Sequence, residues 1–224
     1  MRCKQDMLDA GETIVPRTCP VHGIQRCRPL MLSDMNTGKK HPAPDSLDRG
    51  DWMLTGTGKA FYPLDPRADE LDIIDIAHAL SMQCRYGGHS KRFYSVAEHC
   101  VLMATAAPEP LKLAALMHDG SEGYLQDVIR PVKVHLTNYL SIEDKLMRVI
   151  ADRFGFAWPL VPEIKVLDER MLGAEREQAV IFPKGKAWSQ WKPVEPLDVT
   201  LRFWAPDAAF HEFMAAFYRY GGKS

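Results

Sequence analysis

The sequence has no apolar run long enough to cross a membrane, and its charges of opposite sign nearly cancel. A membrane-spanning helix needs about 20 consecutive apolar residues, and no such run occurs among the 224 residues. The 28 Lys and Arg residues face 29 Asp and Glu residues, so the formal net charge is −1. This balance gives no electrostatic basis for binding nucleic acid or an anionic membrane, and we expect neither as a partner.

Cysteine is scarce, and the N-terminus lacks the apolar core of an export signal. The five cysteines are an odd number, and Cys84 and Cys100 lie in apolar stretches with helical spacing. Such a set favours free thiols in a reducing compartment over a disulfide framework. Residues 1–16, MRCKQDMLDAGETIVP, are polar and charged, unlike a signal peptide. We therefore expect a cytoplasmic protein.

Residues 1–50 differ in composition from the rest of the chain. They are rich in proline, glycine and charged residues and show no helical or strand period. Within them, Cys19, His22 and Cys27 offer three metal ligands at close spacing, whereas a structural zinc site needs four. We expect a loosely ordered extension over residues 1–50 and one folded domain over residues 51–224.

Apolar residues with helical spacing dominate the folded domain, so its expected class is all-α. A short segment around Gly56 and Gly58 is compatible with a small β-hairpin. The expected helices cover residues 69–84, 95–107, 110–124, 141–155, 162–182 and 206–220.

Helix boundaries are expected from the residues that cap them. Ser95, with Glu98 three residues later, has the spacing of a capping box. Ser141 is expected to begin a helix that Gly155 ends. Asp69 and Glu70 are expected in the first turn of their helix, where negative charge favours the helix dipole.

The stretch ALMHDGSEGYLQD, residues 115–127, places ionisable groups directly after an apolar helical run. Successive residues of an α-helix turn by about 100°, which puts Glu122 on the face between His118 and Asp119. His118 and Asp119 can then bind one metal ion. Glu122 can take a proton from a water whose pKa that ion has lowered.

Two ligands do not hold a catalytic ion, so neighbouring helices are expected to supply more. His99 lies on an apolar helix, and Asp168 lies among apolar residues where an unpaired carboxylate is costly to bury. Taken singly, His99 can equally be a core histidine and Asp168 a salt-bridged helix residue. Together with His118 and Asp119 they form a mixed nitrogen and oxygen set, which suits Mn, Fe, Co, Ni or Zn better than Mg.

Three segments resemble the HD-domain phosphohydrolase superfamily, in particular its bacterial and phage 5′-deoxynucleotidases and deoxynucleotide triphosphohydrolases. The segments are RYGGHSKRFYSVAEH, ALMHDGSEGYLQDVIRPVK and LDERMLGAERE, and the resemblance covers residue 52 to the C-terminus. It implies a compact helical bundle that binds one divalent ion. The implied metal ligands are His99, His118, Asp119 and Asp168. The implied catalytic carboxylates are Glu122 and Asp127.

The resemblance also implies residues that contact the substrate. Arg85 and Lys133 stand where this branch places phosphate-binding residues, and both can alternatively be solvated surface charges. Tyr86 stands where relatives stack an aromatic ring on the nucleobase. His89 can contact phosphate or protonate a leaving group, although the two glycines before it can simply mark a turn.

These patterns predict a metal-dependent phosphohydrolase that removes phosphate from the 5′ end of a (deoxy)nucleotide and releases the nucleoside. One alternative is a triphosphohydrolase of deoxynucleoside triphosphates such as dATP. Another, from a different class, is a non-catalytic nucleotide sensor or adaptor. The aromatic-rich residues 208–220 also predict a homo-oligomer that buries part of that helix.

Overall fold

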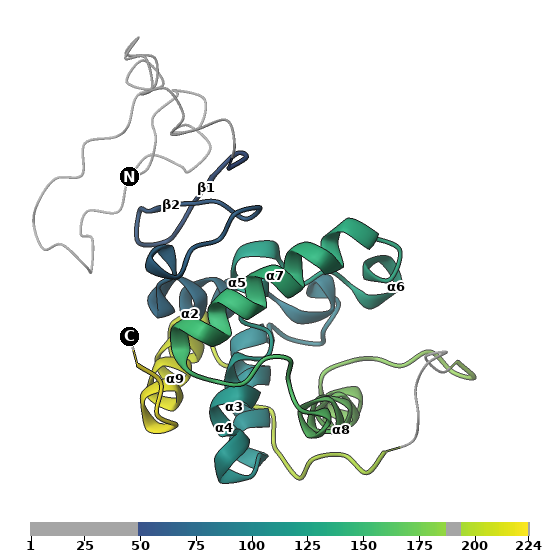
Figure 1. Ribbon diagram of the computed structural model, residues 1–224. Helices are drawn as coiled ribbons and strands as arrows, with labels where there is room; N and C mark the ends of the chain where they lie inside the picture. The colour runs from purple at the N-terminus through teal and green to yellow at the C-terminus, as the bar shows by residue number, and fades with distance from the viewer. Residues whose placement is uncertain (1–48, 187–193, 224) are drawn as a thin grey trace, which may run out of the picture. The chain divides into compact units, whose positions relative to one another are not determined.

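The computed structural model describes residues 49–186 and 194–223, and they are mostly helical (Figure 1). The predicted extension, residues 1–50, lies almost entirely outside the described residues, and so does its cysteine–histidine cluster; both stay predictions. The elements are β1 (Met53–Leu54), β2 (Ala60–Phe61), η2 (Ala68–Glu70), α2 (Ile73–Met82), η3 (Arg85–Gly88), α3 (Val96–Ala106), η4 (Glu109–Leu111), α4 (Lys112–Met117), α5 (Glu122–Leu125), α6 (Arg130–Lys133), α7 (Thr137–Phe154), α8 (Pro162–Gln178) and α9 (Pro206–Arg219).

The predicted β-hairpin is present. Strands β1 and β2 pair antiparallel, and Gly58 turns the chain between them with a φ of +84°, a conformation that favours glycine. The turn docks on α2 because the N–H and hydroxyl of Thr57 donate to the Asp75 carboxylate at 2.7 and 2.8 Å. At the end of β2, Phe61 is fully buried and stacks on Tyr124, with ring centroids 4.1 Å apart.

Helix α2 begins four residues later than the sequence predicted. Asp72 caps it, because its side chain accepts a hydrogen bond from the Ile74 N–H at 3.0 Å. Glu70, expected inside the helix, instead pairs with Arg49 at 2.8 Å. An N-cap carboxylate satisfies a backbone N–H that has no partner within the helix, so Asp72 rather than Asp69 sets the start.

Helix α3 lies at the centre of the bundle and contacts α2, α4, α8 and α9 (Figure 1). Ser95 caps it as predicted, accepting from the Glu98 N–H at 3.1 Å. The second contact of a capping box, in which the Glu98 side chain would accept from the Ser95 N–H, was predicted wrongly. The Glu98 carboxylate accepts three backbone N–H groups of residues 202–204 instead, at 2.6–2.9 Å, and thereby fixes the segment before α9.

The helix predicted over residues 110–124 is broken into η4, α4 and α5. Between α4 and α5 the backbone bonds run from each N–H to the third carbonyl back, as from Gly120 to Met117 at 2.9 Å. Gly123 allows α5 to approach α2 closely, since a Cβ at this position would lie 3.2 Å from the Ile76 Cα. This tight turn leaves His118 and Asp119 at the end of α4.

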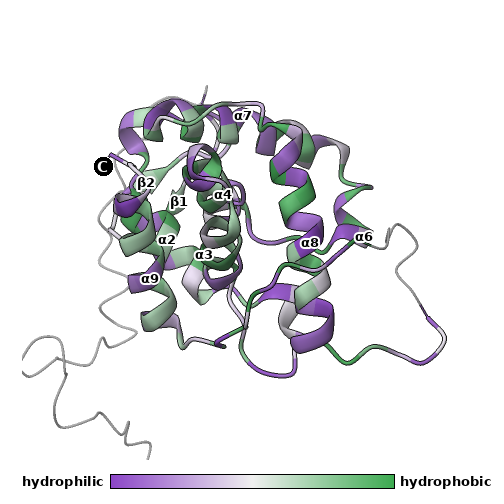
Figure 2. Ribbon diagram, turned by 90° about the horizontal axis from the view of Figure 1, so that it is seen from below, coloured by the Kyte–Doolittle hydropathy of each residue, from purple (hydrophilic) through white to green (hydrophobic). Residues whose placement is uncertain are grey.

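The later helices match the predictions except at their ends. Helix α7 begins at Thr137, so Ser141 lies inside it and donates to the Asn138 carbonyl at 2.8 Å. Gly155 ends α7 in the left-handed conformation, as predicted. Helix α8 ends at Gln178, four residues before the predicted end. Figure 2 shows hydrophilic and hydrophobic residues alternating along α7 and α8, as expected for helices with one buried face.

Two aromatic residues of α9 pack in the core of this chain rather than on its surface. Phe213 and Phe217 are fully buried, and α9 contacts α2, α3 and α4. Tyr218 is the large aromatic of this helix that remains exposed, at 54%. The aromatic pattern is therefore explained by the core, and the predicted homo-oligomer stays a prediction without that support.

Candidate metal centre

Four predicted ligands lie together at the ends and sides of α3, α4 and α8. The Nε2 atom of His99 is 3.2 Å from the Nε2 atom of His118 and 3.6 Å from Oδ1 of Asp168. The Oδ2 atom of Asp119 is 3.2 Å from Nε2 of His118 and 3.8 Å from Nε2 of His99. Residues far apart in the sequence thus come together: His99, His118 and Asp168 place three possible ligand atoms within 4.8 Å of one another, and Asp119 adjoins both histidines.

The spacing of these atoms suits one metal ion. Ligand atoms about 2.0–2.2 Å from an ion are about 3–4 Å from one another, as are the pairs measured here. The imidazole tautomers also support a metal site. Nδ1 of His118 lies 2.8 Å from the Ala115 carbonyl and Nδ1 of His99 lies 2.6 Å from the Glu175 carboxylate. Each Nδ1 is therefore the donor, which leaves two Nε2 lone pairs facing each other for a cation to satisfy.

The carboxylates favour positive charge at this point. Burial opposes a charged imidazole, yet the adjacent Asp119 holds the pKa of His118 well above its ordinary value. Burial also opposes a charged carboxylate, yet His118 holds the pKa of Asp119 well below its ordinary value. The electrostatics that draw a proton onto a buried histidine also stabilise a metal cation there.

Cys100 lies beside the group, although the sequence indicated only a free thiol in an apolar helical stretch. Its Sγ atom is 3.9 Å from Nδ1 of His118, and Cys100, His118 and Asp119 form a second possible ligand group. Burial raises the pKa of the Cys100 thiol to about 11. Because metals bind the thiolate, this environment favours the histidine and aspartate ligands over Cys100.

Glu122 follows the ligands on the tight turn, but not at the predicted angle. With bonds from each N–H to the third carbonyl back, residues three apart align, so Glu122 stands in line with Asp119 rather than between Asp119 and His118. Its Oε2 atom is buried without a hydrogen-bond partner among the described residues. Burial, together with the negative charges of Asp119 and Asp127, raises the pKa of Glu122 well above its ordinary value. A carboxylate in this environment is a good proton acceptor.

Lys133 and Asp127 lie on the same side as Glu122. Nζ of Lys133 is 3.7 Å from Oε1 of Glu122 and also pairs with Glu143. Burial raises the pKa of Asp127. Gln83 holds this region together, because its side chain donates to the Glu122 carbonyl at 2.8 Å and accepts from the Asp127 N–H at 2.9 Å. The sequence predictions did not include Gln83 or Glu143.

Arg85 and Tyr86 lie in η3, where Arg85 is beside Asp119 and both residues contact Glu175. NH1 of Arg85 is 3.6 Å from Oδ2 of Asp119, and NH2 donates to Glu175 at 3.2 Å. The Tyr86 hydroxyl also donates to Glu175, and burial raises the pKa of Tyr86. Arg85 is therefore a mostly buried cation beside the ligands rather than a solvated surface charge. The structure does not test stacking of Tyr86 on a base.

Glu175 is a further residue of this site that the sequence predictions missed. It is fully buried in α8, seven residues after Asp168, which on an α-helix is about two turns along the same face. Although burial disfavours its charge, Arg85 and His99 lower the pKa of Glu175 to about 2. The seven-residue spacing within LDERMLGAERE was the signal available in the sequence.

His89 does not join the group within the described residues. It is exposed at the end of η3, where its backbone N–H donates to the Tyr86 carbonyl at 3.1 Å. The preceding Gly87 and Gly88 both have positive φ, which supports a tight turn as the reason for the two glycines.

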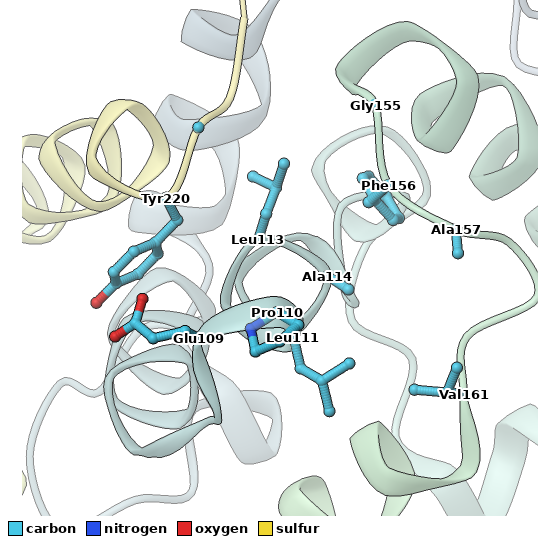
Figure 3. Close-up of a pocket in the computed structure, with 11 residues that line it drawn as sticks. Glu109, Pro110, Leu111, Leu113, Ala114, Gly155, Phe156, Ala157, Val161 and Tyr220 are labelled. Carbon is cyan, nitrogen blue, oxygen red and sulfur yellow. The ribbon is translucent and has the colours of Figure 1, made fainter.

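One cavity lies away from these residues (Figure 3). Its volume is about 440 Å³, and it lies between the start of α4 and the C-terminal ends of α7 and α9. Its lining includes Leu111, Phe156 and Tyr220 and none of the predicted site residues. The candidate metal centre is at the other end of α4, after Met117.

Among the described residues, no helix has the length and apolar character that crossing a bilayer requires. No family model matches the chain. Two curated proteins are similar to it, and both are named as uncharacterized. Protein YfdR of Escherichia coli (strain K12) is 36% identical over 170 residues, which cover 74% of this chain and 93% of YfdR. Protein RCAP_rcc00048 of Rhodobacter capsulatus is 35% identical over 150 residues, which cover 61% of this chain and 76% of that protein.

Proposed function

The chain belongs to the family of Escherichia coli YfdR, and we propose that it is a metal-dependent phosphohydrolase acting at the 5′ end of (deoxy)nucleotides. The observation that carries the proposal is the pair of histidine Nε2 atoms 3.2 Å apart, flanked by two aspartates and followed by a buried Glu122. A binding module has no need of a buried carboxylate that has one oxygen without a hydrogen-bond partner beside a group of possible metal ligands.

His99, His118, Asp119 and Asp168 would hold one divalent ion. Nitrogen and oxygen ligands together favour Mn, Fe, Co, Ni or Zn, with Mg less suited. When bound, such an ion supplies a Lewis acid that lowers the pKa of water and stabilises charge on phosphate oxygens.

Glu122 is the proposed proton acceptor. Its raised pKa suits removal of a proton from the attacking water. Lys133, 3.7 Å away, stabilises the charged carboxylate before the transfer and compensates phosphate charge afterwards. Asp127 lies close enough to Glu122 to raise its pKa through charge repulsion, so Asp127 tunes the acceptor in this scheme.

Arg85 is the second proposed phosphate contact. NH1 of Arg85 lies 3.6 Å from Asp119, so the guanidinium borders the space that a phosphate beside the ion would occupy. Charge-assisted bonds from arginine to phosphate stabilise the negative charge that develops as the P–O bond breaks. The choice of a nucleotide, with Tyr86 against its base, rests on the resemblance to HD-domain phosphohydrolases.

The test is a panel of 5′-mono-, di- and triphosphates of ribo- and deoxynucleosides, assayed with Mn²⁺, Co²⁺ or Mg²⁺ and resolved by chromatography. Orthophosphate and nucleoside are the expected products. Release of intact triphosphate from dATP would favour the triphosphohydrolase alternative. Tight nucleotide binding without turnover under any metal would favour a sensor or adaptor and reject the enzyme.

A further inference from the structure

We propose that Glu175 is a positioning residue that holds the metal ligand His99 and the phosphate contact Arg85 in one network and thereby couples metal binding to phosphate binding. The roles of His99 and Arg85 in this proposal rest on the proposed function. The contacts of Glu175 itself do not.

Glu175 is fully buried, and its two carboxylate oxygens meet donors from three separate segments of the chain. An isolated buried carboxylate is strongly unfavourable, so such a group is stable only when it is well paired. The groups around it are the His99 Nδ1 at 2.6 Å, the Tyr94 hydroxyl at 2.9 Å, the Tyr86 hydroxyl and the Arg85 guanidinium at 3.2 Å.

The contact with His99 determines which ring nitrogen is available to an ion. Oε1 of Glu175 accepts a hydrogen bond from the N–H at Nδ1 of His99. The lone pair of Nε2 is therefore directed at His118 and Asp168, at 3.2 and 3.6 Å. A carboxylate in this position fixes the tautomer and orientation of a ligating imidazole and raises its basicity.

The contacts with Arg85 determine where the guanidinium points. NH2 donates to Oε2 at 3.2 Å, while Nε lies 3.2 Å from Oε1 without hydrogen-bond alignment. NH1 is left on the Asp119 side, 3.6 Å from Oδ2. The planar guanidinium cannot turn NH1 elsewhere without breaking its contacts with Glu175.

The Glu175 carboxylate therefore fixes the orientation of both His99, which would bind the ion, and Arg85, which lies next to the ion site. Occupation of the metal site orders His99 and, through Glu175, orders Arg85 before phosphate arrives. A group that both binding events need in one arrangement couples their free energies.

The first experiment measures Co²⁺ binding to Glu175→Gln by calorimetry and by the visible absorption of the bound ion. We expect affinity to fall about 10- to 100-fold, the usual effect of losing an outer carboxylate, with a changed absorption spectrum. Tyr94→Phe is the matched control, because it removes only a hydroxyl that donates to Glu175 at 2.9 Å and leaves the contacts of that carboxylate with His99 and Arg85 in place. Tyr94→Phe should lose stability yet keep the wild-type Co²⁺ affinity and spectrum.

The second experiment measures inorganic phosphate binding to the Co²⁺-saturated proteins in a double-mutant cycle. Arg85→Gln should weaken phosphate binding about tenfold or more in the wild-type background. In the Glu175→Gln background the same change should have little further effect, because the arginine is already misplaced. Fully additive losses would overturn the coupling.

A folded Glu175→Gln with wild-type Co²⁺ affinity and spectrum would overturn the positioning role. Should that variant fail to fold, the wild-type protein still decides the matter through ¹⁵N NMR of its histidines. His99 must carry its proton on Nδ1 when Zn²⁺ is bound, and a proton on Nε2 would refute the proposal. None of these measurements needs turnover, so absence of nucleotidase activity would reject the proposed function while leaving the Glu175 network standing.

Discussion

The backbone N–H of Glu122 donates to the carbonyl oxygen of Asp119 at 3.0 Å, so the chain after His118 forms a tight turn. This bond aligns the two carboxylates along one side of the turn. Glu122 is thereby held near Asp119 but away from His118, which suits a proton acceptor better than an additional ligand. Lys133 completes the arrangement at 3.7 Å from Glu122.

Replacing this acceptor should separate turnover from metal binding. Glu122→Gln is expected to lower nucleotide turnover by at least about a hundredfold, because a positioned base contributes that much, while Co²⁺ affinity stays at the wild-type level. Steady-state assays and calorimetry measure the two effects. Glu109→Gln, a change at a side chain that is 84% exposed, is the control and should be active. Near-normal turnover in Glu122→Gln would show that another group takes the proton.

Removing one ligand should abolish the effect of metal on stability. For the wild-type protein, Mn²⁺ or Co²⁺ at a hundred times its dissociation constant should raise the free energy of unfolding by about 2.7 kcal/mol. His118→Ala should lose this response, whereas the exposed His135 can be replaced by alanine without losing it. Thermal unfolding with and without EDTA is the measurement. A His118→Ala protein that metal still stabilises would place the ion elsewhere.

The two partly buried cations should act on every nucleotide alike. Arg85→Gln and Lys133→Gln are expected to raise KM for all substrates of the panel by about tenfold, since each substrate carries the phosphate that they contact. Arg130→Gln alters an exposed arginine three residues before Lys133 and should leave KM unchanged. Equal KM values for Lys133→Gln and wild type would remove Lys133 from the phosphate site.

Tyr86 should instead change the ranking of bases. Tyr86→Ala is expected to lose about 1–3 kcal/mol of binding free energy, by different amounts for purines and pyrimidines, if the ring stacks on the base. Tyr86→Phe keeps the ring and removes only the hydroxyl that donates to Glu175, so it should preserve the ranking. Uniform losses across bases in Tyr86→Ala would assign the residue to the Glu175 network alone.

Glu98 should stabilise the fold without affecting the chemistry. Glu98→Ala leaves three backbone N–H groups of residues 202–204 without their acceptor. Because an unsatisfied buried donor costs about 1–3 kcal/mol, the free energy of unfolding should fall by about 3 kcal/mol or more in urea denaturation. Glu212→Ala, at an exposed position of α9, should change it little. A small loss in Glu98→Ala would mean that water replaces the carboxylate.

Local features of the fold followed from the sequence because their causes are local. Ser95 and Gly155 act within one turn of their helices, and apolar spacing marks a helix wherever it occurs. Asp69 and Ser141, which the sequence predicted near the starts of their helices, do not begin them. Asp72 supplied a better cap for α2, whereas α7 begins one turn before Ser141, with Leu136 at its N-cap and no side-chain cap bond.

The sequence by itself determined the helical class, the hairpin and the order in which the four candidate ligands occur. Only the tertiary structure decided that those ligands meet, that Glu122 aligns with Asp119, and that Phe213 and Phe217 of α9 belong to the core. It alone brought Glu175 to His99 across 76 positions and Glu98 to the chain before α9 across more than 100. Buried charges are paired wherever packing brings a partner near, and packing depends on all the helices at once, which no short stretch of sequence encodes.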